Sequence, residues 1–350
     1  MTPPPPAEFA WFGALCDDDY EQLGVPDENL RSSWDHCREI VAEAESAGYD
    51  NILLPSGYSL GIDTVSFASS VAPLTRVMRL LVAVRCGEVW APQLARQLAT
   101  LDLTLGGRLT VNIISSEMPG EVMDGPRRYR RTLEVMRILR ALMRGERVDM
   151  EGEFHTLHLD PPRITAENPV DPEFYFGGLS EEARDVAAQE ADVYLMWPDT
   201  EDMVAATIDD MRSRAASYGR ELRFGYRCHV VVRGTESEAV HAANRLVEHV
   251  DEGTGERIRS QSLDSQSTGV RRQAQLREGA AADGFVEDNL WTGIGRARSG
   301  CGAAIVGTPA QVAAKIGRYR ELGIDAFILS GYPHIAECRR FAADVLPLVR

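Results

Sequence analysis

The amino-acid sequence predicts a (β/α)8 (TIM) barrel, an α/β fold, built as a single domain over residues 1–350. Short apolar runs alternate with longer amphipathic stretches almost from end to end. About 250 residues plus insertions is the usual size of such a barrel. A doubly wound open sheet would instead place a glycine-rich turn after its first strand. The segment at that position, "LCDDDYEQLGVPDEN", has no GxGxxG pattern, so the barrel is the predicted fold class.

Eight short apolar runs are predicted to be the barrel strands, and helical patterns lie between them. Two of these patterns end at Gly48 and Gly219, which is where a glycine commonly terminates a helix. The predicted strands are Glu8–Leu15, Asn51–Leu54, Arg79–Val84, Leu109–Ile114, Glu173–Gly177, Val193–Met196, Phe224–Val232 and Ala326–Leu329.

Three further segments exceed a minimal barrel. The stretch "RVDMEGEFHTLHLDPPRI" alternates on both sides of Gly152 and predicts a hairpin after the fourth helix. Residues 253–302 are polar and rich in arginine, and we expect a mobile lid insertion without regular structure there, before the last strand. Residues 1–7 are rich in proline and predict an extended arm rather than a signal peptide.

Composition excludes several classes of partner. The formal net charge of −16 argues against nucleic acid or an anionic membrane as the partner, because both require a basic face. No apolar run approaches the roughly 20 residues of a membrane span. The six cysteines are widely spaced and form no CxxC pair, which predicts a reducing cytoplasm rather than a disulfide framework.

Polar and aromatic side chains gather at the predicted strand ends that would face the active site of a barrel. Any one of them could be structural, but their convergence at one end of the barrel favours a site. Arg227 and His229 are two residues apart on one strand and therefore point to the same side. The set comprises Asn112, Ser115 and Ser116 after the fourth strand, Trp197 after the sixth, Arg227 and His229 in the seventh, Arg298 in the insertion, and Tyr332 and His334 after the eighth.

Several chemistries are disfavoured by what these strand ends lack. They carry no paired carboxylates for glycoside hydrolysis and no HExxH motif or His/Asp cluster for a metal. Ser180 in "GGLSEEA" is not part of a GxSxG elbow, and its simplest role is as the N-cap of a helix. The same Gly-Gly-x-Ser turn is also a candidate cradle for a phosphate.

Five stretches in chain order together resemble the bacterial luciferase-like flavin monooxygenases, most closely the alkanesulfonate monooxygenase group. They extend over roughly residues 50–345, nearly the whole chain, and the last is the most specific. The stretches are "VAPLTRVMRLLVAVRCG", "ARQLATLDLTLGGRLTVNII", "FYFGGLSEEARDVAAQEADVYLMW", "YRCHVVVR" and "VGTPAQVAAKIGRYRELGIDAFILSGYPH".

The resemblance implies an enzyme that uses reduced FMN (FMNH2) and O2 to cleave the carbon–sulfur bond of an organosulfonate, which releases sulfite and an aldehyde. It also implies a separate NAD(P)H-dependent flavin reductase as partner and a homodimer or homotetramer. By the same resemblance, the sulfonate and the reacting oxygen would be surrounded by Trp197, Arg227, His229, Arg298, Tyr332 and His334. The flavin would contact Asn112, Ser115, Tyr129, Gly178, Leu179 and Ser180.

The chain departs from the family pattern at a few positions. Leu60 stands where a cysteine is usual, Cys16 where a histidine is usual, and Leu179 where the first of two serines is usual. Ser115 and Ser116 replace a common Thr-Gly. These changes disfavour a simple alkanesulfonate, and Arg296, an extra cation near Arg298, suggests a sulfosugar such as sulfoquinovose. A deazaflavin (F420)-dependent oxidoreductase on the same barrel and a non-catalytic flavin-binding protein remain alternatives.

Overall fold

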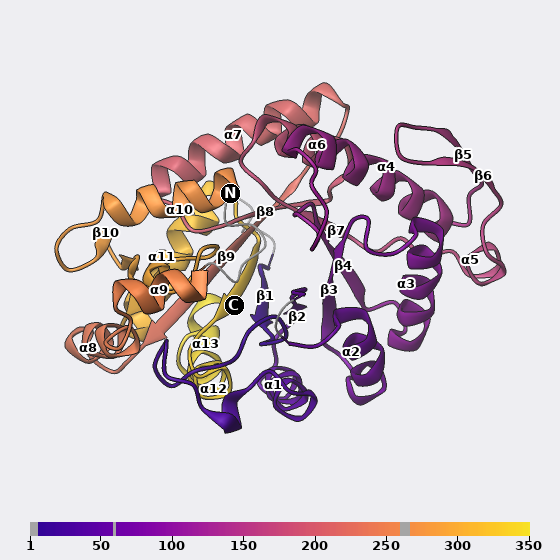
Figure 1. The fold of residues 1–350 in the computed structure, drawn as a ribbon. Coiled ribbons are helices and arrows are strands. Elements are labelled where there is room, and N and C mark those ends of the chain that lie inside the picture. The colour runs from indigo at the N-terminus through magenta and orange to yellow at the C-terminus, as the bar shows by residue number, and fades with distance from the viewer. Residues whose placement is uncertain (1–5, 59–60, 260–266) are drawn as a thin grey trace.

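A closed ring of eight parallel strands forms the centre of the molecule (Figure 1). The structure is a computed structural model, and it describes residues 6–58, 61–259 and 267–350. Strand β1 pairs with β13 and β2, and β8 pairs with β9 to close the ring. The predicted barrel is confirmed. Its strands are β1 (Glu8–Phe12), β2 (Asn51–Leu54), β3 (Arg79–Arg85), β4 (Leu109–Ile114), β7 (Phe174–Phe176), β8 (Val193–Met196), β9 (Arg223–Val232) and β13 (Ala326–Ser330).

Side chains alternate between the two faces of each barrel strand, as the pleat requires. In β1, Phe9 and Trp11 belong to the large core between strands and helices, whereas Ala10 belongs to the small core inside the barrel. In β13, Phe327 faces outward and Ile328 inward in the same way. Burial on both faces explains why these strands are short continuous apolar runs.

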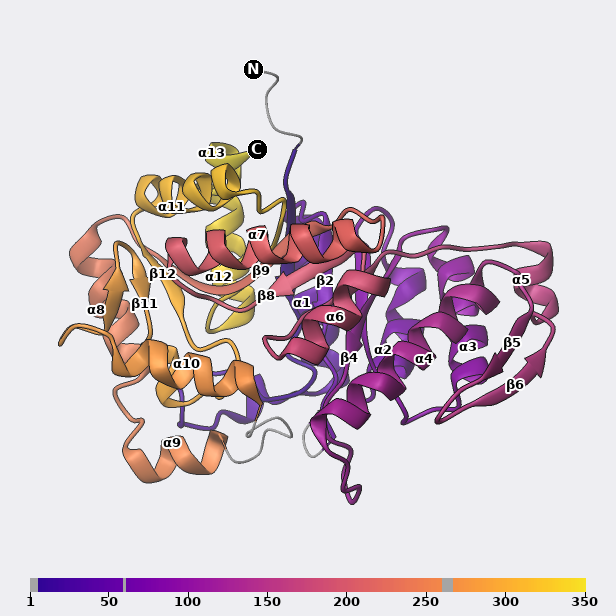
Figure 2. The same ribbon diagram turned by 90° about the horizontal axis from the view of Figure 1, so that it is seen from above.

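Helices cover the outside of the ring (Figures 1 and 2). The glycines predicted to terminate two of them adopt left-handed backbone conformations, with φ of 82° at Gly48 and 69° at Gly219. The helices are α1 (Trp34–Ser46), α2 (Thr64–Val71), α3 (Ala91–Leu105), α4 (Gly125–Met143), α5 (Arg163–Glu167), α6 (Glu181–Glu190), α7 (Glu201–Ser217), α8 (Glu236–Leu246), α11 (Pro309–Leu322), α12 (His334–Asp344) and α13 (Leu346–Val349), with short 3-10 turns at η1 (Glu28–Leu30) and η2 (Ala72–Leu74).

The hairpin predicted after the fourth helix is present. Strands β5 (Val148–Glu151) and β6 (Thr156–Leu159) pair antiparallel and form a sheet separate from the barrel. In both views this hairpin lies at the opposite end of the molecule from the insertion that contains α9 (Glu252–Arg259) and α10 (Thr268–Glu278) (Figures 1 and 2). It therefore stands apart from that insertion.

The expectation that residues 253–302 lack regular structure is wrong. Besides α9 and α10, this segment forms β10 (Phe285–Glu287), β11 (Leu290–Trp291) and the 3-10 turn η3 (Gly293–Arg296). Part of it is ordered by burial, since Trp291 and Ile294 belong to a second apolar cluster beside the barrel. Residues 260–266 of the predicted lid, residues 1–5 of the predicted arm, and Leu60 lie outside the described residues.

The sequence analysis also missed strand β12 (Ala304–Gly307), which follows the insertion. Strand β9 has ten residues, whereas β8, its neighbour in the barrel, has four. The far half of β9 therefore extends beyond β8, and its backbone groups require another partner. Strand β12 supplies that partner by pairing with His229–Val232, and β11 then pairs antiparallel with β12. The insertion is thereby attached to the strand that carries the predicted site.

Candidate active site

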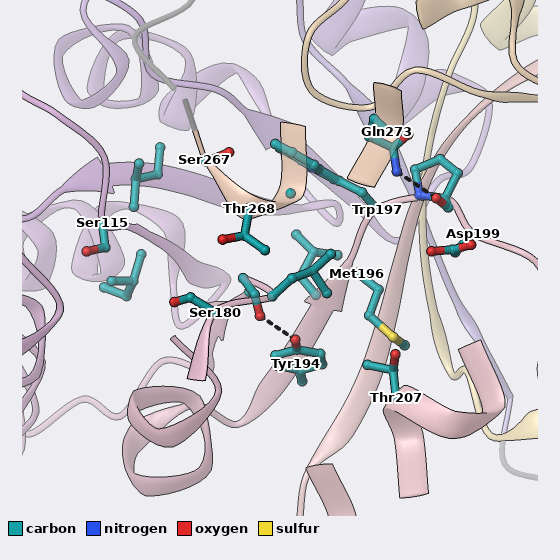
Figure 3. Close-up of a pocket in the computed structure, with 18 of the residues that line it drawn as sticks. Ser115, Ser180, Tyr194, Met196, Trp197, Asp199, Thr207, Ser267, Thr268 and Gln273 are labelled. Carbon is teal, nitrogen blue, oxygen red and sulfur yellow. Dashed lines mark hydrogen bonds between the residues drawn. The ribbon is translucent and has the colours of Figure 1, made fainter. Parts of the chain in front are cut away.

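Two adjoining cavities lie at the carboxyl ends of the barrel strands, where barrels place their active sites. One, of about 310 Å³, is lined by arginine, histidine and tyrosine side chains and is called the basic cavity. The other, of about 250 Å³, is lined by Ser115, Ser180 and Ser267 among others and is called the serine cavity (Figure 3). Asn112, Leu195 and Trp197 line both cavities.

All six residues predicted to surround the substrate line the basic cavity: Trp197, Arg227, His229, Arg298, Tyr332 and His334. The convergence expected from the strand ends is therefore present in the structure, except that Ser116 is buried and is not among the residues that line either cavity. All six residues predicted to contact the flavin line the serine cavity: Asn112, Ser115, Tyr129, Gly178, Leu179 and Ser180. The chemical roles given to these residues remain predictions.

Strand β9 positions Arg227 and His229 on the inner wall. The Arg227 side chain is buried and lies over the ring of Phe12, 4.2 Å from its centroid. Its Nη1 donates to the carbonyl of Cys228 at 2.9 Å, and the guanidinium forms no ion pair with any described residue. A buried cation without a carboxylate partner is costly unless a ligand supplies the anion.

His229 is held in the neutral form. Burial lowers its pKa well below the ordinary value, and the charges of Arg227 and His334 lower it further. Its Nδ1 lies 2.7 Å from the hydroxyl of Ser330, and its ring stacks on Tyr332 at 5.3 Å. At neutral pH, His229 therefore offers the site a hydrogen-bonding group rather than a charge.

Asp19 fixes the orientation of His334 at the start of α12. Its Oδ2 accepts from the backbone N–H of His334 at 2.9 Å and lies 3.1 Å from His36 Nε2. Its Oδ1 lies 2.7 Å from His334 Nδ1. Burial alone would raise the pKa of the Asp19 carboxyl. The charge of His334 and hydrogen bonds from both histidines outweigh burial and lower this pKa well below its ordinary value. His334 Nε2 is buried and has no hydrogen-bond partner within the described chain. That nitrogen is available to a ligand in the basic cavity.

Arg298 enters the same cavity from the insertion. Its Nε donates to the hydroxyl of Tyr332 at 2.8 Å, and its guanidinium forms an ion pair with Asp17. Its carbon atom Cζ lies 5.4 Å from the ring centre of Tyr332 and 5.8 Å from that of Tyr20. Burial raises the pKa of Tyr332, and the charge of Arg298 opposes this shift. Arg298 is thus held over the cavity by one hydroxyl, one carboxylate and two rings.

The sequence analysis missed Arg85 as a residue of the site. It is the last residue of β3, its side chain is 4% exposed, and it lines the basic cavity. Its Nε lies 2.9 Å from Glu88, at an angle outside hydrogen-bond geometry, and Nη1 has no hydrogen-bond partner among the residues described. The predicted strand stopped one residue earlier, and the strand-end rule that selected Asn112 would also have selected Arg85.

The loop after β1 contributes two further residues that were not predicted. Asp17 and Asp18 line the basic cavity beside Cys16. Burial raises the pKa of the Cys16 thiol, and the charges of the three cavity arginines oppose this shift. The run "CDDDY" follows the first strand directly, so its position was the available signal.

Arg296 does not lie where the sequence analysis placed it. It is exposed, does not line the basic cavity, and donates from Nη2 to the carbonyl of Val250. It is the last residue of η3, and a side chain two positions before Arg298 on such a tight turn points in another direction. The extra cation of the cavity is Arg85 rather than Arg296.

The turn between β7 and α6 forms one end of the serine cavity. Ser180 is the N-cap of α6, as predicted, and accepts from the backbone N–H of Ala183 at 3.2 Å. A Cβ on Gly178 would approach the Cβ of Ala183 to 2.6 Å, and φ there is 156°. The hydroxyl of Tyr194 donates to the Gly178 carbonyl at 2.5 Å (Figure 3). Glycine at this position therefore allows the turn to pack closely against α6.

The residues of the serine cavity fit a flavin mononucleotide. The Ser115 hydroxyl and Arg128 Nε are buried in its wall without a hydrogen-bond partner in the described part of the chain. The N-terminus of α6 and the Ser180 hydroxyl suit a phosphate. Apolar side chains of Ile113, Leu195 and Met196 line the remainder and suit a flat ring system.

Helix α10 of the insertion covers Trp197, which separates the two cavities. A Cβ on Gly269 would lie 2.9 Å from the Trp197 ring, and one on Gly300 would lie 3.2 Å from it. The Asp199 carboxylate accepts two hydrogen bonds from Arg272, each of 2.6 Å. Gln273 donates to the carbonyl of Pro198 at 2.7 Å (Figure 3). The insertion therefore forms part of the wall of both cavities.

Comparison with known proteins agrees with this geometry. A family model described as luciferase-like monooxygenase matches residues 8–326. The chain belongs to this family. It is 61% identical over 347 residues to a sulfoquinovose monooxygenase of Novosphingobium aromaticivorans. The matched region covers 97% of this chain and 96% of that protein. A sulfoquinovose monooxygenase of Agrobacterium fabrum is 49% identical, with 98% of this chain and 90% of that protein covered.

Among solved structures, the EDTA monooxygenase from Chelativorans sp. BNC1 has a TM-score of 0.77 and covers 98% of this chain and 93% of that one. Its sequence identity is 14%, so this likeness concerns the fold. The family resemblance inferred from the five stretches is confirmed, and family membership supports an enzyme with a flavin cofactor. No helix of the described residues is long and apolar enough to cross a membrane.

Proposed function

We propose that the protein is a two-component monooxygenase that uses reduced FMN and O2 to cleave the carbon–sulfur bond of a sulfosugar such as sulfoquinovose. The products would be sulfite and an aldehyde. The observation that carries the proposal is the basic cavity, where the buried Arg227 has no carboxylate partner among the described residues and lies beside a second cavity that fits a flavin. The names of the 61% and 49% identical relatives support the sulfosugar.

The substrate anion belongs at Arg227. A sulfonate is a permanent anion and is stabilised by charge-assisted donors, of which a guanidinium offers two in one plane. Arg227 has no carboxylate competing for these donors within the described chain. Arg298, the neutral His229, Tyr332 and His334 line the same cavity, with Tyr332 in contact with both Arg298 and His229. These residues bind and orient the carbon that carries the sulfur.

When bound in the serine cavity, reduced FMN supplies the electrons and the reactive site for O2. The chain's own contribution there is to hold the cofactor through Asn112, Ser115, Tyr129, Ser180 and the Gly178–Leu179 backbone. Trp197 and α10 exclude water from the boundary between the cavities. Delivery of the cofactor by an NAD(P)H-dependent flavin reductase is part of the proposal, as is a homodimer or homotetramer.

The test is sulfite release by the purified protein with a flavin reductase, NAD(P)H, FMN and air. Sulfoquinovose, octanesulfonate and taurine serve as the panel of sulfonates. We expect sulfite from sulfoquinovose in preference to the other two, and none from the Arg227→Met variant. Absence of sulfite from every sulfonate would contradict the proposal. Turnover with reduced deazaflavin and without O2 would instead indicate the oxidoreductase alternative.

A further inference from the structure

Asp17 places a negative charge in a cavity proposed to bind an anion. It lies on the loop after β1 and lines the basic cavity, with 16% of its side chain exposed. One carboxylate oxygen accepts from the backbone N–H of Asp18 at 2.8 Å, and the other pairs with Arg298. A carboxylate in this position repels any sulfonate that enters the cavity. Arg298 offsets this charge within the chain, and the pair leaves a carboxylate acceptor beside guanidinium donors at the cavity.

Asp17 is only one of the groups that hold Arg298 in place. The Nε of Arg298 already donates to Tyr332 at 2.8 Å, and the rings of Tyr332 and Tyr20 lie against the guanidinium. Pairing with Asp17 also weakens Arg298 as a cation for a sulfonate. The pair presents donors and acceptors side by side, which suits a group that both donates and accepts hydrogen bonds.

Two other buried atoms show that the cavity is built for more polar groups than one sulfonate. Arg85 Nη1 and His334 Nε2 are both buried, line the same cavity through their side chains, and have no hydrogen-bond partner among the described residues. Both residues are more than nine-tenths buried, at 5% and 2% exposed. Such groups are costly to leave unpaired, so a ligand with several hydroxyl groups fits this wall.

We propose that Asp17 is a specificity-determining residue that selects a polyhydroxylated sulfonate over one without hydroxyl groups. A sugar hydroxyl donates to the Asp17 carboxylate and accepts from the neighbouring Arg298, while the sulfonate binds at Arg227. This inference rests on the proposed function and extends it. A hydroxyl-free sulfonate meets the repulsion of the carboxylate and gains nothing from it, so Asp17 acts against that class of ligand.

The test compares two ligands that share a sulfonate on a six-membered ring. Sulfoquinovose carries ring hydroxyls, and cyclohexylmethanesulfonate carries none. Dissociation constants are measured by calorimetry, anaerobically and with reduced FMN present, for the wild type and Asp17→Asn. Both ligands carry a sulfonate, so a substitution that changes only the binding of the sulfonate changes both dissociation constants equally. Their ratio then stays the same. A hydrogen bond to a charged group is worth about tenfold to hundredfold in affinity, so we expect Asp17→Asn to reduce the preference for sulfoquinovose by at least about tenfold.

Asp18→Asn is the matched control, because Asp18 lines the same cavity, carries the same charge and has no arginine partner within the described residues. We expect it to leave the ratio within about twofold. Asp17→Ser replaces Asp17→Asn should the latter lower the thermal midpoint. A wild type without preference, an Asp17 variant that keeps the preference, or an equal loss in Asp18→Asn overturns the assignment. A wild type that neither binds sulfoquinovose nor releases sulfite from it refutes the proposed function itself.

Discussion

At the scale of single residues, the site depends on which charges have partners. Arg298 is paired with Asp17 and Arg85 with Glu88, whereas Arg227 pairs with no described carboxylate. Sequence position predicted that Arg227 and Arg298 lie at one end of the barrel. It could not predict these pairings, because Asp17 and Arg298 are far apart in the chain and meet only when β1 and the insertion are folded.

Arg298 is expected to contribute to turnover and little to stability. It lies on the insertion, outside the barrel core, so its loss leaves the apolar packing intact. We predict that Arg298→Ala abolishes sulfite release and shifts the thermal midpoint by only about 1–2 °C. Arg298→Lys should recover little activity, because an ammonium group cannot reproduce a planar pair of donors. Near-normal turnover of Arg298→Ala would remove this residue from the mechanism.

His229 makes stability depend on pH. Its folded-state pKa lies well below the value of about 6.5 expected in the unfolded chain, so the unfolded chain takes up a proton first as the pH falls. The contribution of the neutral His229 to the free energy of unfolding is fully present above pH ~6.5. Below that pH it is lost by about 1.4 kcal/mol per pH unit, until the folded-state pKa is reached. We predict a smaller fall in thermal midpoint between pH 7.5 and pH 5.5 in His229→Gln. Parallel curves for both proteins would show that His229 is not protonated on unfolding.

At the scale of elements, the strands were predictable and the insertion was not. Burial on both faces makes the barrel strands predominantly apolar, which sequence alone reveals. Helices α9 and α10 are predominantly polar, and they are held by contacts with distant residues. Arg272 to Asp199 is one such contact, and Gln273 to Pro198 is another. Strand β12 was missed because it pairs with the part of β9 that extends beyond the shorter β8. The difference in length between β8 and β9 is a property of the assembled sheet.

The ion pair of Arg272 with Asp199 is expected to hold α10 over Trp197. We predict that Arg272→Ala raises the KM for the sulfonate several-fold and speeds amide hydrogen exchange in α10, because the helix loses two charge-assisted hydrogen bonds. The thermal midpoint should change little, since the barrel core is not involved. Gln275→Ala is the control, as this residue of the same helix is exposed. Equal effects of both substitutions would argue against a specific attachment.

At the scale of the whole molecule, the two cavities share Asn112, Leu195 and Trp197, which is where the proposed cofactor and substrate would meet. Strand ends line both cavities, as the barrel prediction required, and the insertion completes their walls. Arg296 was placed wrongly because neighbours in sequence need not face the same cavity on a 3-10 turn. Arg85 was missed because the predicted strand ended one residue early. The fold and the gathering of these side chains at one end of the barrel were therefore readable from sequence, while partner contacts and side-chain direction depended on the assembled chain.

The proposed delivery of the cofactor by a partner protein leads to a prediction about affinity. We predict that reduced FMN binds at least about tenfold more tightly than oxidised FMN, because a flavin received from a reductase is to be captured in its reduced form and released after oxidation. Anaerobic titrations monitored by tryptophan fluorescence measure both constants. Protein that purifies with stoichiometric yellow flavin would contradict this prediction.

The most direct test of the central claim omits the reductase. Photochemically reduced FMN is mixed with the purified protein and sulfoquinovose, and sulfite is measured with and without O2. We predict sulfite release that requires both O2 and reduced FMN and that does not exceed the reduced FMN supplied, with none when the flavin is oxidised. Equal sulfite release in the absence of O2, or none under any of these conditions, would contradict the assignment of this barrel as a sulfosugar monooxygenase.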